Sequence, residues 1–235
     1  MGISALEPGI LAEANQNILY IDEVNLLPDH IADGILDAAA SGWNIVERES
    51  ISVAHPSRFI LIGSMNPEEG ELRPQLLDRF SLHISIEGVF DQEQRVEIIQ
   101  NNLDFGENPL KFRKKFEKEQ ELIRIKISQA KKILNKVRTP DPLIEAVARS
   151  CINLGVDGHR PDIATVRASR TLAAFEGRRE VILDDILKVS GMAIGFRTRQ
   201  SGFEEPATPE QVTEVLTTIL REMGLLRGRE LEKPQ

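Results

Sequence analysis

Residues 17–27 constrain this chain more than any other stretch. They read Asn-Ile-Leu-Tyr-Ile-Asp-Glu-Val-Asn-Leu-Leu, so four apolar or aromatic residues run without a polar break into two adjacent acids, Asp22 and Glu23. A short unbroken apolar run is typical of a strand buried on both faces of a parallel sheet, and open α/β sheets bind ligands at the carboxyl ends of such strands. The pattern predicts a buried strand over residues 18–24 that presents two carboxylates at a ligand-binding edge.

Two adjacent carboxylates at such an edge suit phosphate chemistry. In nucleotide hydrolases one carboxylate holds the Mg²⁺ that bridges the phosphates, usually through water, and another polarises the water that attacks the γ-phosphate. Asp22 and Glu23 are the candidates for these two roles. The structural alternative is an apolar strand that ends in a solvated acidic turn.

A second apolar run, within residues 58–66, also ends in a polar residue, Asn66. It predicts a neighbouring buried strand whose carboxyl end lies at the same edge. An amide there can donate a hydrogen bond to a phosphate oxygen and accept one from a water molecule, which are the contacts that position a nucleophile.

A short helix is expected over residues 71–80, and it carries Arg73 and Arg79. An arginine of this helix that faces a neighbouring subunit can stabilise the charge that develops on the γ-phosphate there. The alternative for Arg79 is a local ion pair with Asp78 or another nearby acid.

Composition and periodicity complete the expected organisation. A net charge of −8 argues against a nucleic-acid binder, and the single cysteine, Cys151, excludes an internal disulfide. No run of about 18 apolar residues occurs, so we expect neither a membrane span nor a signal peptide and place the protein in the cytoplasm. The further elements expected are a short helix near Pro8, a helix over 28–41, a β-hairpin with a charged tip over 43–53, a third strand over 82–86, a helix capped at 91–94, a solvated charged helical stretch over 105–137, helices over 143–154, 162–176 and 183–193, an amphipathic helix over 210–220 and a disordered end over 227–235.

A loop over residues 156–162 joins two of the expected helices and holds Arg160 just before Pro161. An arginine at such a helix start can reach a γ-phosphate and report its hydrolysis to a helical domain. Arg167, one or two turns further on, is the second candidate for this role.

Several motifs together resemble a known family. They are Leu-Glu-Pro-Gly-Ile-Leu-Ala-Glu-Ala-Asn, Ile-Leu-Tyr-Ile-Asp-Glu-Val-Asn-Leu-Leu, Ala-Ala-Ser-Gly-Trp-Asn-Ile-Val-Glu-Arg-Glu, His-Pro-Ser-Arg-Phe and Asn-Pro-Glu-Glu-Gly-Glu-Leu-Arg-Pro-Gln-Leu-Leu-Asp-Arg-Phe. Residues 4–101, which contain them, resemble the second half of the AAA+ module of the magnesium chelatase ATPase subunit I family, and the later helices resemble its lid domain.

The resemblance implies an α/β fold. The fold would be a partial AAA+ P-loop NTPase core, with a parallel sheet whose N-terminal strands are missing, followed by an all-α lid domain. The expected divisions are residues 1–104 for the α/β part with a hairpin insertion over 43–54, 105–138 for a charged helical linker, 139–196 for the lid and 197–235 for a linker and final helix.

The resemblance also implies roles for the candidate residues. Asp22 and Glu23 match the Walker B pair, with Asp22 on the Mg²⁺ of Mg-ATP, Asn66 matches sensor 1, Arg79 matches the arginine finger that acts on the adjacent protomer, and Arg160 matches sensor 2. The implied cofactors are ATP and Mg²⁺. The implied partners are further copies in a ring, commonly a hexamer, a second AAA+ chelatase subunit and a large porphyrin-binding subunit that receives Mg²⁺ into protoporphyrin IX.

The sequence departs from the family at several places. It contains no Gly-Lys pair, so the Gly-x-x-x-x-Gly-Lys-Ser/Thr loop that cradles phosphates (Walker A) is absent, which predicts a fragment that by itself binds ATP weakly or not at all. His159 and Pro161 stand where the family more usually has leucine and glycine, and the tail after Gly195 diverges. A non-catalytic AAA+ assembly partner, a MoxR-like AAA+ chaperone and a cobalt chelatase relative are therefore the alternatives, and the tetrapyrrole and metal stay open.

Overall fold

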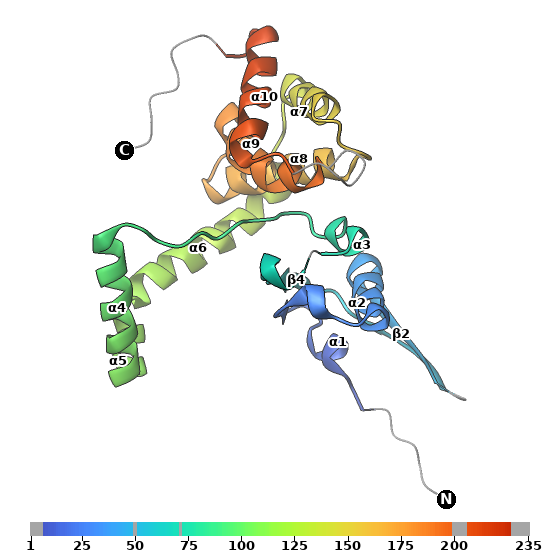
Figure 1. Ribbon diagram of the computed structural model, residues 1–235, viewed down its shortest axis with the longest axis vertical. Coiled ribbons are helices and arrows are strands. Elements are labelled where there is room, and N and C mark those ends of the chain that lie inside the picture. Colours follow the sequence, from blue (N-terminus) through green and yellow to red (C-terminus); the bar gives the residue numbers. More distant parts are fainter. Residues whose placement is uncertain (1–6, 49–50, 71, 199–205, 227–235) are drawn as a thin grey trace, which may run out of the picture. The chain divides into compact units, whose positions relative to one another are not determined.

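The computed structural model describes residues 7–48, 51–70, 72–198 and 206–226. The chain divides into two compact units, Met1–Phe80 and Ser81–Gln235. The first unit mixes strands and helices, and the described part of the second consists of helices and their connections (Figure 1). The predicted α/β class, with a mostly helical C-terminal portion, is confirmed.

The sheet of the first unit is parallel, as predicted. In the described residues, β1 (Ile18–Ile21) pairs with β4 (Ile60–Gly63), and the register places Ile18 opposite Ile60 and Ile21 opposite Gly63. The chain crosses from β1 to β4 through a 3-10 turn (Val24–Leu26), helix α2 (Asp29–Ser41) and a hairpin. Parallel pairing brings the carboxyl ends of both strands to one edge.

The prediction that β1 is buried on both faces and extends to Val24 is wrong. Leu19 is buried, but Ile18 and Tyr20 are each 59% exposed, and the strand ends at Ile21. Successive side chains of a strand point to opposite faces, and only the face toward α2 is covered by the small core of this unit. That core consists of Ala32, Leu36 and Leu76, with Leu27, Leu61 and Leu72 packed against it.

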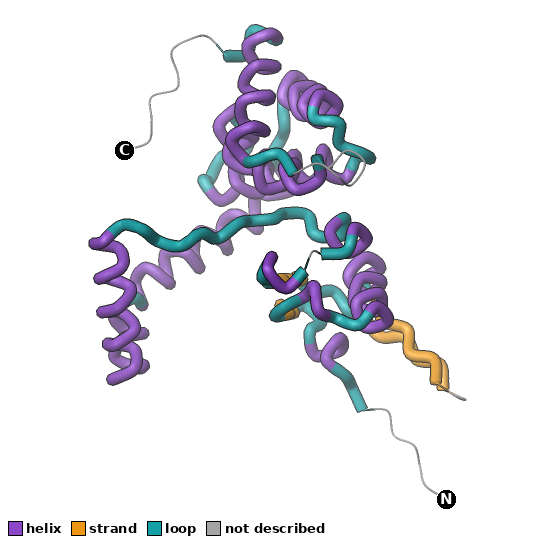
Figure 2. Tube along the Cα trace, viewed as in Figure 1, coloured by secondary structure: helices purple, strands orange, loops and turns teal. Residues whose placement is uncertain are grey.

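The predicted β-hairpin is present directly after α2. Helix α2 ends at Gly42, whose φ of 74° lies in the left-handed region that a glycine adopts without strain. Strands β2 (Trp43–Arg48) and β3 (Ile51–Pro56) then pair antiparallel, with Trp43 opposite Pro56, and they are the long orange pair in Figure 2. The residues of its charged tip, 49 and 50, lie outside the described residues.

Short helices complete the first unit. Helix α1 (Ile10–Glu13) precedes β1, a 3-10 turn (Pro67–Glu69) follows β4, and α3 (Pro74–Leu77) occupies the middle of the helix predicted over 71–80. The buried Ser57 hydroxyl donates a hydrogen bond of 2.8 Å to the carbonyl of Leu11, which ties α1 to the start of β4.

The strand predicted over residues 82–86 is wrong. This segment has no regular secondary structure and pairs with no strand in the described part of the chain, and Ile84 and Ile86 are 66% and 93% exposed. Its backbone contact is with a helix instead, because His83 N–H donates a bond of 2.8 Å to the carbonyl of Met192. An apolar run becomes a strand only when another strand offers a ladder of backbone partners.

The helix predicted to start at the cap over 91–94 is present, and the charged stretch over 105–137 is helical as predicted but divided between helices. The helices are α4 (Gln92–Glu107), α5 (Pro109–Lys115) and α6 (Glu117–Ile133). Asp91 caps α4 by accepting a hydrogen bond from Gln94 N–H at 2.9 Å. No helix in the described residues combines the length and apolar character that crossing a membrane requires.

Four helices form the core of the second unit and lie together in Figure 1. They are α7 (Asp141–Asn153), α8 (Arg160–Phe175), α9 (Leu183–Ile194) and α10 (Pro209–Glu222). Helix α10 buries Val212, Leu216, Ile219 and Leu220, the apolar side of an amphipathic helix, as its sequence predicts. The end over 227–235 lies outside the described residues, and the predicted domain boundaries stay predictions.

Candidate functional site

The predicted acids and the predicted amide follow the carboxyl ends of neighbouring strands. Asp22 and Glu23 come directly after β1, and Asn66 lies three residues after β4. The ladder continues past both strands, since Ser64 N–H donates to the Ile21 carbonyl at 3.0 Å and Val24 N–H donates to the Ser64 carbonyl at 2.9 Å. The first unit therefore brings these three residues to one edge of its sheet, as the sequence predicts.

Two hydroxyl groups surround one oxygen of Asp22. The Ser64 hydroxyl donates a short hydrogen bond to Asp22 Oδ1, and the Tyr20 phenol oxygen lies 3.1 Å from both Asp22 Oδ1 and Ser64 Oγ. Hydrogen bonds to an ionised carboxylate favour its charged form, so Ser64 and then Tyr20 hold the pKa of Asp22 below its ordinary value. Asp22 is a carboxylate, and therefore a potential cation ligand, at neutral pH.

Glu23 adopts a left-handed backbone conformation, with φ 51° and ψ 52°. This conformation costs a non-glycine residue about 1–2 kcal/mol, and strained residues of this kind cluster at functional sites. The side chain is exposed. The bend also ends β1 and begins the 3-10 turn at Val24, which turns the chain sharply at the sheet edge.

Asn66 is exposed, and its backbone carbonyl accepts a hydrogen bond of 3.1 Å from Glu69 N–H at the start of the 3-10 turn. Within the described part of the chain its side-chain amide makes no hydrogen bond. Both the donor and the acceptor of this amide are therefore available to a ligand.

The two arginines around α3 differ in their contacts. Arg73 forms an ion pair with Asp29 and donates to the Leu27 carbonyl at 3.3 Å, so it ties α3 to the start of α2. Arg79 is exposed, and among the described residues its guanidinium forms no ion pair or hydrogen bond. Of the two, Arg79 is the one whose charge can act outside its own unit.

Arg160 belongs to the second unit and is the first residue of α8. Its charge lies close enough to Arg197 to lower the pKa of that guanidinium, although burial of Arg197 is the larger cause. Arg197 also lies over the Phe196 ring at 4.7 Å from the centroid. The alternative candidate, Arg167, is exposed on α8.

The residues at the sheet edge fit magnesium bound together with a nucleotide. Carboxylate, amide and hydroxyl oxygens are the protein ligands that Mg²⁺ accepts, and the ion keeps several waters and binds phosphates in nucleotide sites. Among the described residues, no group of three or more His, Cys, Asp or Glu side chains is arranged to hold a metal ion. The chain therefore suits an ion held by phosphates and water with Asp22, rather than by a cage of side chains.

Sequence reasoning missed Tyr20 and Ser64. A usable signal was present, because residues two apart on a strand share a face and place Tyr20 beside Asp22. Ser64 follows the neighbouring strand, so parallel pairing brings it alongside Asp22. Only the register of β1 against β4 shows which residue of the second strand meets the acid.

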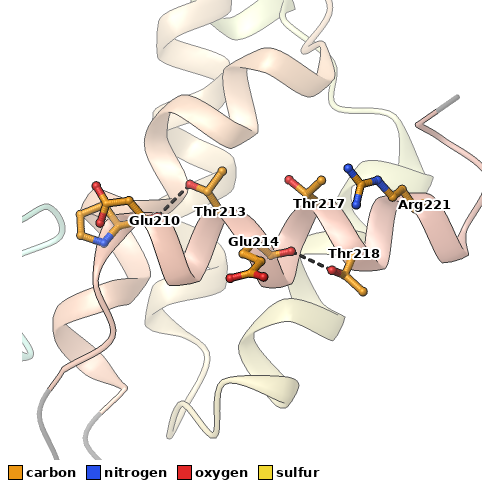
Figure 3. Close-up of a pocket in the computed structure, with 7 residues that line it drawn as sticks. Glu210, Thr213, Glu214, Thr217, Thr218 and Arg221 are labelled. Atoms are coloured by element: carbon orange, nitrogen blue, oxygen red, sulfur yellow. Dashed lines mark hydrogen bonds between the residues drawn. The ribbon is translucent and has the colours of Figure 1, made fainter. Parts of the chain in front are cut away.

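The described cavities lie elsewhere. One of about 470 Å³ runs along the outer side of α10, where the Thr213 and Thr218 hydroxyls donate to carbonyls of their own helix (Figure 3). Another of about 670 Å³ lies between α4, α5 and α6 beside Phe105, Phe112 and Phe116. Neither contains a predicted site residue.

Two family models match the chain. Residues 144–219 match the AAA lid domain, and residues 2–75 match "Magnesium chelatase, subunit ChlI". The crystal structure of a putative ATPase from Cytophaga hutchinsonii is 18% identical, covers 87% of this chain and 65% of that chain, and has a TM-score of 0.58, which supports the fold alone. The fold is that of part of an AAA+ module, an α/β portion followed by a helical lid domain.

Curated relatives narrow this class. The magnesium-chelatase subunit ChlI homolog of Methanocaldococcus jannaschii is 52% identical over 95% of this chain and 61% of its own length. The magnesium-chelatase subunit ChlI of Cyanophora paradoxa is 48% identical over 93% of this chain and 63% of its own length. The chain belongs to the magnesium chelatase subunit ChlI family, and it spans about three fifths of the length of these two relatives.

Proposed function

We propose that this chain is part of the ATP-hydrolysing AAA+ subunit of a magnesium chelatase. In this proposal, ATP hydrolysis within a ring of subunits drives insertion of Mg²⁺ into protoporphyrin IX on a partner protein. The observation that supports the proposal is the parallel pairing of β1 with β4, after whose carboxyl ends Asp22, Glu23 and Asn66 follow, in a chain with these relatives.

The acidic pair divides the chemistry between its members. Asp22, kept ionised by its hydroxyl neighbours, would hold the Mg²⁺ that accompanies ATP through water. That ion supplies neutralising charge to the phosphates when it is bound. Glu23 polarises the attacking water and accepts its proton as the water oxygen bonds to the γ-phosphorus and the bond to the leaving ADP oxygen breaks. The exposed position of Glu23 leaves it open to water.

The other predicted residues act on charge and position. The amide of Asn66 orients the attacking water or a γ-phosphate oxygen. Arg79, with no ion pair among the described residues, acts as an arginine finger on the nucleotide of the adjacent protomer. Arg160 contacts the γ-phosphate from the helical lid and links hydrolysis to movement of the lid.

The ring and its partners are part of the proposal. We propose a cytoplasmic hexamer that works with a second AAA+ subunit and a large porphyrin-binding subunit. The hairpin β2–β3 supports a role in such contacts, because Trp43 and Ile45 are 48% and 65% exposed on it. Exposed aromatic and aliphatic side chains of this kind are typical of protein contacts.

Residues 1–235 contain no Gly-Lys pair, so the phosphate loop that this function needs lies outside them. We therefore expect these residues alone to bind ATP weakly or not at all. Micromolar ATP binding by the isolated 235-residue chain, measured by calorimetry, would contradict this expectation.

The missing phosphate loop also suggests a second candidate function. A chain without a phosphate loop can serve as a non-catalytic assembly partner that offers Arg79 to a neighbour's nucleotide. The two functions can be distinguished by measuring the ATPase rate of a mixture of this chain with a subunit that contains a phosphate loop. If this chain is a non-catalytic partner, Arg79→Ala should lower the neighbour's ATPase rate, and Glu23→Gln should leave that rate unchanged.

The main proposal is tested with Glu23→Gln in the full-length protein that carries these residues. We expect ATP turnover to fall about 10²–10⁴-fold while nucleotide binding is retained, because loss of a general base affects chemistry and not binding. Glu13→Gln, at another exposed acid of the first unit, is the matched control and should not change turnover. Unchanged hydrolysis in Glu23→Gln would overturn the assignment.

A further inference from the structure

We propose that Ser64 and Tyr20 are positioning residues that hold the Asp22 carboxylate in the orientation needed for the metal–nucleotide complex. The inference rests on the proposed function and adds two residues to it. Both hydroxyl groups contact the same carboxylate oxygen, Oδ1, and neither contacts Oδ2. The two hydroxyl groups thus engage Oδ1, and we assign Oδ2 to the ligand side.

The backbone holds Ser64 firmly in this position. Its N–H donates a hydrogen bond of 3.0 Å to the Ile21 carbonyl, and its own carbonyl accepts one of 2.9 Å from Val24 N–H. The backbone of Ser64 is therefore hydrogen-bonded to the residue before Asp22 and to a residue after it. A hydroxyl anchored through its own peptide groups has little freedom to follow a moving carboxylate. It therefore directs the carboxylate and does not merely respond to it.

Tyr20 is placed by the alternation of the strand. It precedes Asp22 by two residues, and its phenol oxygen lies 3.1 Å from Asp22 Oδ1 and 3.1 Å from Ser64 Oγ. The three oxygens therefore form a closed triangle. Ser64 donates its hydroxyl hydrogen to Asp22 Oδ1, and Tyr20 donates its single phenol hydrogen either to Asp22 Oδ1 or to Ser64 Oγ. The triangle limits rotation of the Asp22 side chain.

Packing does not explain Tyr20. Its side chain is 59% exposed and lies on the uncovered face of the sheet, so it contributes little to the core of the first unit. Exposed hydrogen bonds contribute little net stability, because water competes for the same groups. Groups that orient a metal-binding side chain, by contrast, typically change metal affinity or activity about 10–100-fold when they are removed.

The test uses the full-length protein that carries these residues, with the variants Ser64→Ala, Tyr20→Phe and their combination. Ser64→Thr keeps the hydroxyl, Asp22→Asn removes the charge of the metal-binding group, and Ser128→Ala, at an exposed serine of α6, is the matched control. Mn²⁺ binding in the presence of a non-hydrolysable ATP analogue is measured by electron paramagnetic resonance. The Mg²⁺ dependence of the ATPase rate is measured in parallel, and circular dichroism checks folding.

We expect the Kd for Mn²⁺ to rise about ten-fold in Ser64→Ala and in Tyr20→Phe, at the lower end of the range for such groups because the site is exposed. The Mg²⁺ concentration for half-maximal ATPase rate should rise in the same proportion. Ser64→Thr should bind Mn²⁺ as wild type does, and Ser128→Ala should not change binding. A purely structural role of the triangle would lower the melting temperature without this change in the metal dependence.

Each other outcome overturns a defined statement. If Asp22→Asn weakens Mn²⁺ binding and both hydroxyl variants bind as wild type, the positioning role is wrong while the proposed function stands. If Ser128→Ala weakens binding as much as Ser64→Ala, the effect is general and the inference is wrong. If Asp22→Asn itself binds Mn²⁺ and nucleotide as wild type does, the proposed role of Asp22 is wrong, and the inference with it.

Discussion

Asp185 at the start of α9 offers a sharp test of what stabilises the helical unit. Its side chain is 2% exposed, and its two carboxylate oxygens accept hydrogen bonds of 2.5 and 2.7 Å from Arg178. The second of these oxygens also accepts a bond of 2.9 Å from Ile182 N–H, one of the backbone donors at the helix start. Asp185 therefore holds the loop before α9 to the helix through both a charge and a backbone contact.

We predict that Asp185→Ala lowers the free energy of unfolding by about 3 kcal/mol. Removing one partner of a buried ion pair typically costs about 3–5 kcal/mol. The lower end applies because the Arg178 side chain is 32% exposed, so its abandoned guanidinium regains water. For a protein of this size the change corresponds to a fall of about 6–12 °C in melting temperature.

The neighbouring acid gives the matched control. Asp184 pairs with Lys188 on the outer surface of α9, where the two side chains are 58% and 63% exposed. Such exposed pairs contribute little, so Asp184→Ala should leave the unfolding midpoint nearly unchanged. Asp185→Asn should fall between wild type and Asp185→Ala, since the amide oxygen still accepts the Ile182 N–H.

Urea unfolding followed by circular dichroism at 222 nm measures these changes. Tryptophan or tyrosine fluorescence does not suit the helical unit, because the single Trp and single Tyr of the chain, Trp43 and Tyr20, both lie in the first unit. Equal losses of stability in Asp184→Ala and Asp185→Ala would contradict the prediction, because Asp185 is buried and Asp184 is exposed.

Two further predictions concern packing and pH. Gly195→Ala should destabilise the helical unit by about 1–3 kcal/mol, because a Cβ there would lie 2.7 Å from the Ala207 carbonyl oxygen just before α10. In Gly106→Ala, the control in α4, the Cβ would meet nothing within 4 Å, and alanine favours a helix over glycine. Thermal unfolding of both variants should therefore show a lower melting temperature for the first and a slightly higher one for the second. Burial, and then Asp162, raises the pKa of the Cys151 thiol to about 12, so a thiol reagent at pH 8.5 should label folded protein far more slowly than protein in urea. Because the folded thiol has the higher pKa, its contribution to stability is full below the unfolded pKa of about 8.5 and declines as the pH rises from there toward 12. A Cys151→Ser variant should therefore lose less stability than wild type over that pH range. Equal labelling rates with and without urea would contradict the burial of this thiol.

The chain's periodicity predicted most of the helices because each depends on neighbours in the sequence. The apolar positions of α10, the cap of α4 at Asp91 and the glycine that ends α2 are local signals, and each acts as predicted. The failure over residues 82–86 has the opposite cause. An apolar run there has the composition of a strand, but a strand requires a partner, and the partner that meets His83 is α9.

The sequence by itself indicated the family, the parallel pair of strands, and the positions of Asp22, Glu23 and Asn66 after the carboxyl ends of those strands. These follow from motif identity and from the geometry of parallel strands, whose carboxyl ends coincide. Only the tertiary structure decided how Asp22 is held, because its contact with Ser64 depends on the register between segments 42 residues apart. The tertiary structure also decided the left-handed backbone conformation of Glu23. It decided that Arg73 pairs with Asp29 while Arg79 forms no ion pair among the described residues, because ion-pair partners distant in the sequence meet only when the chain packs.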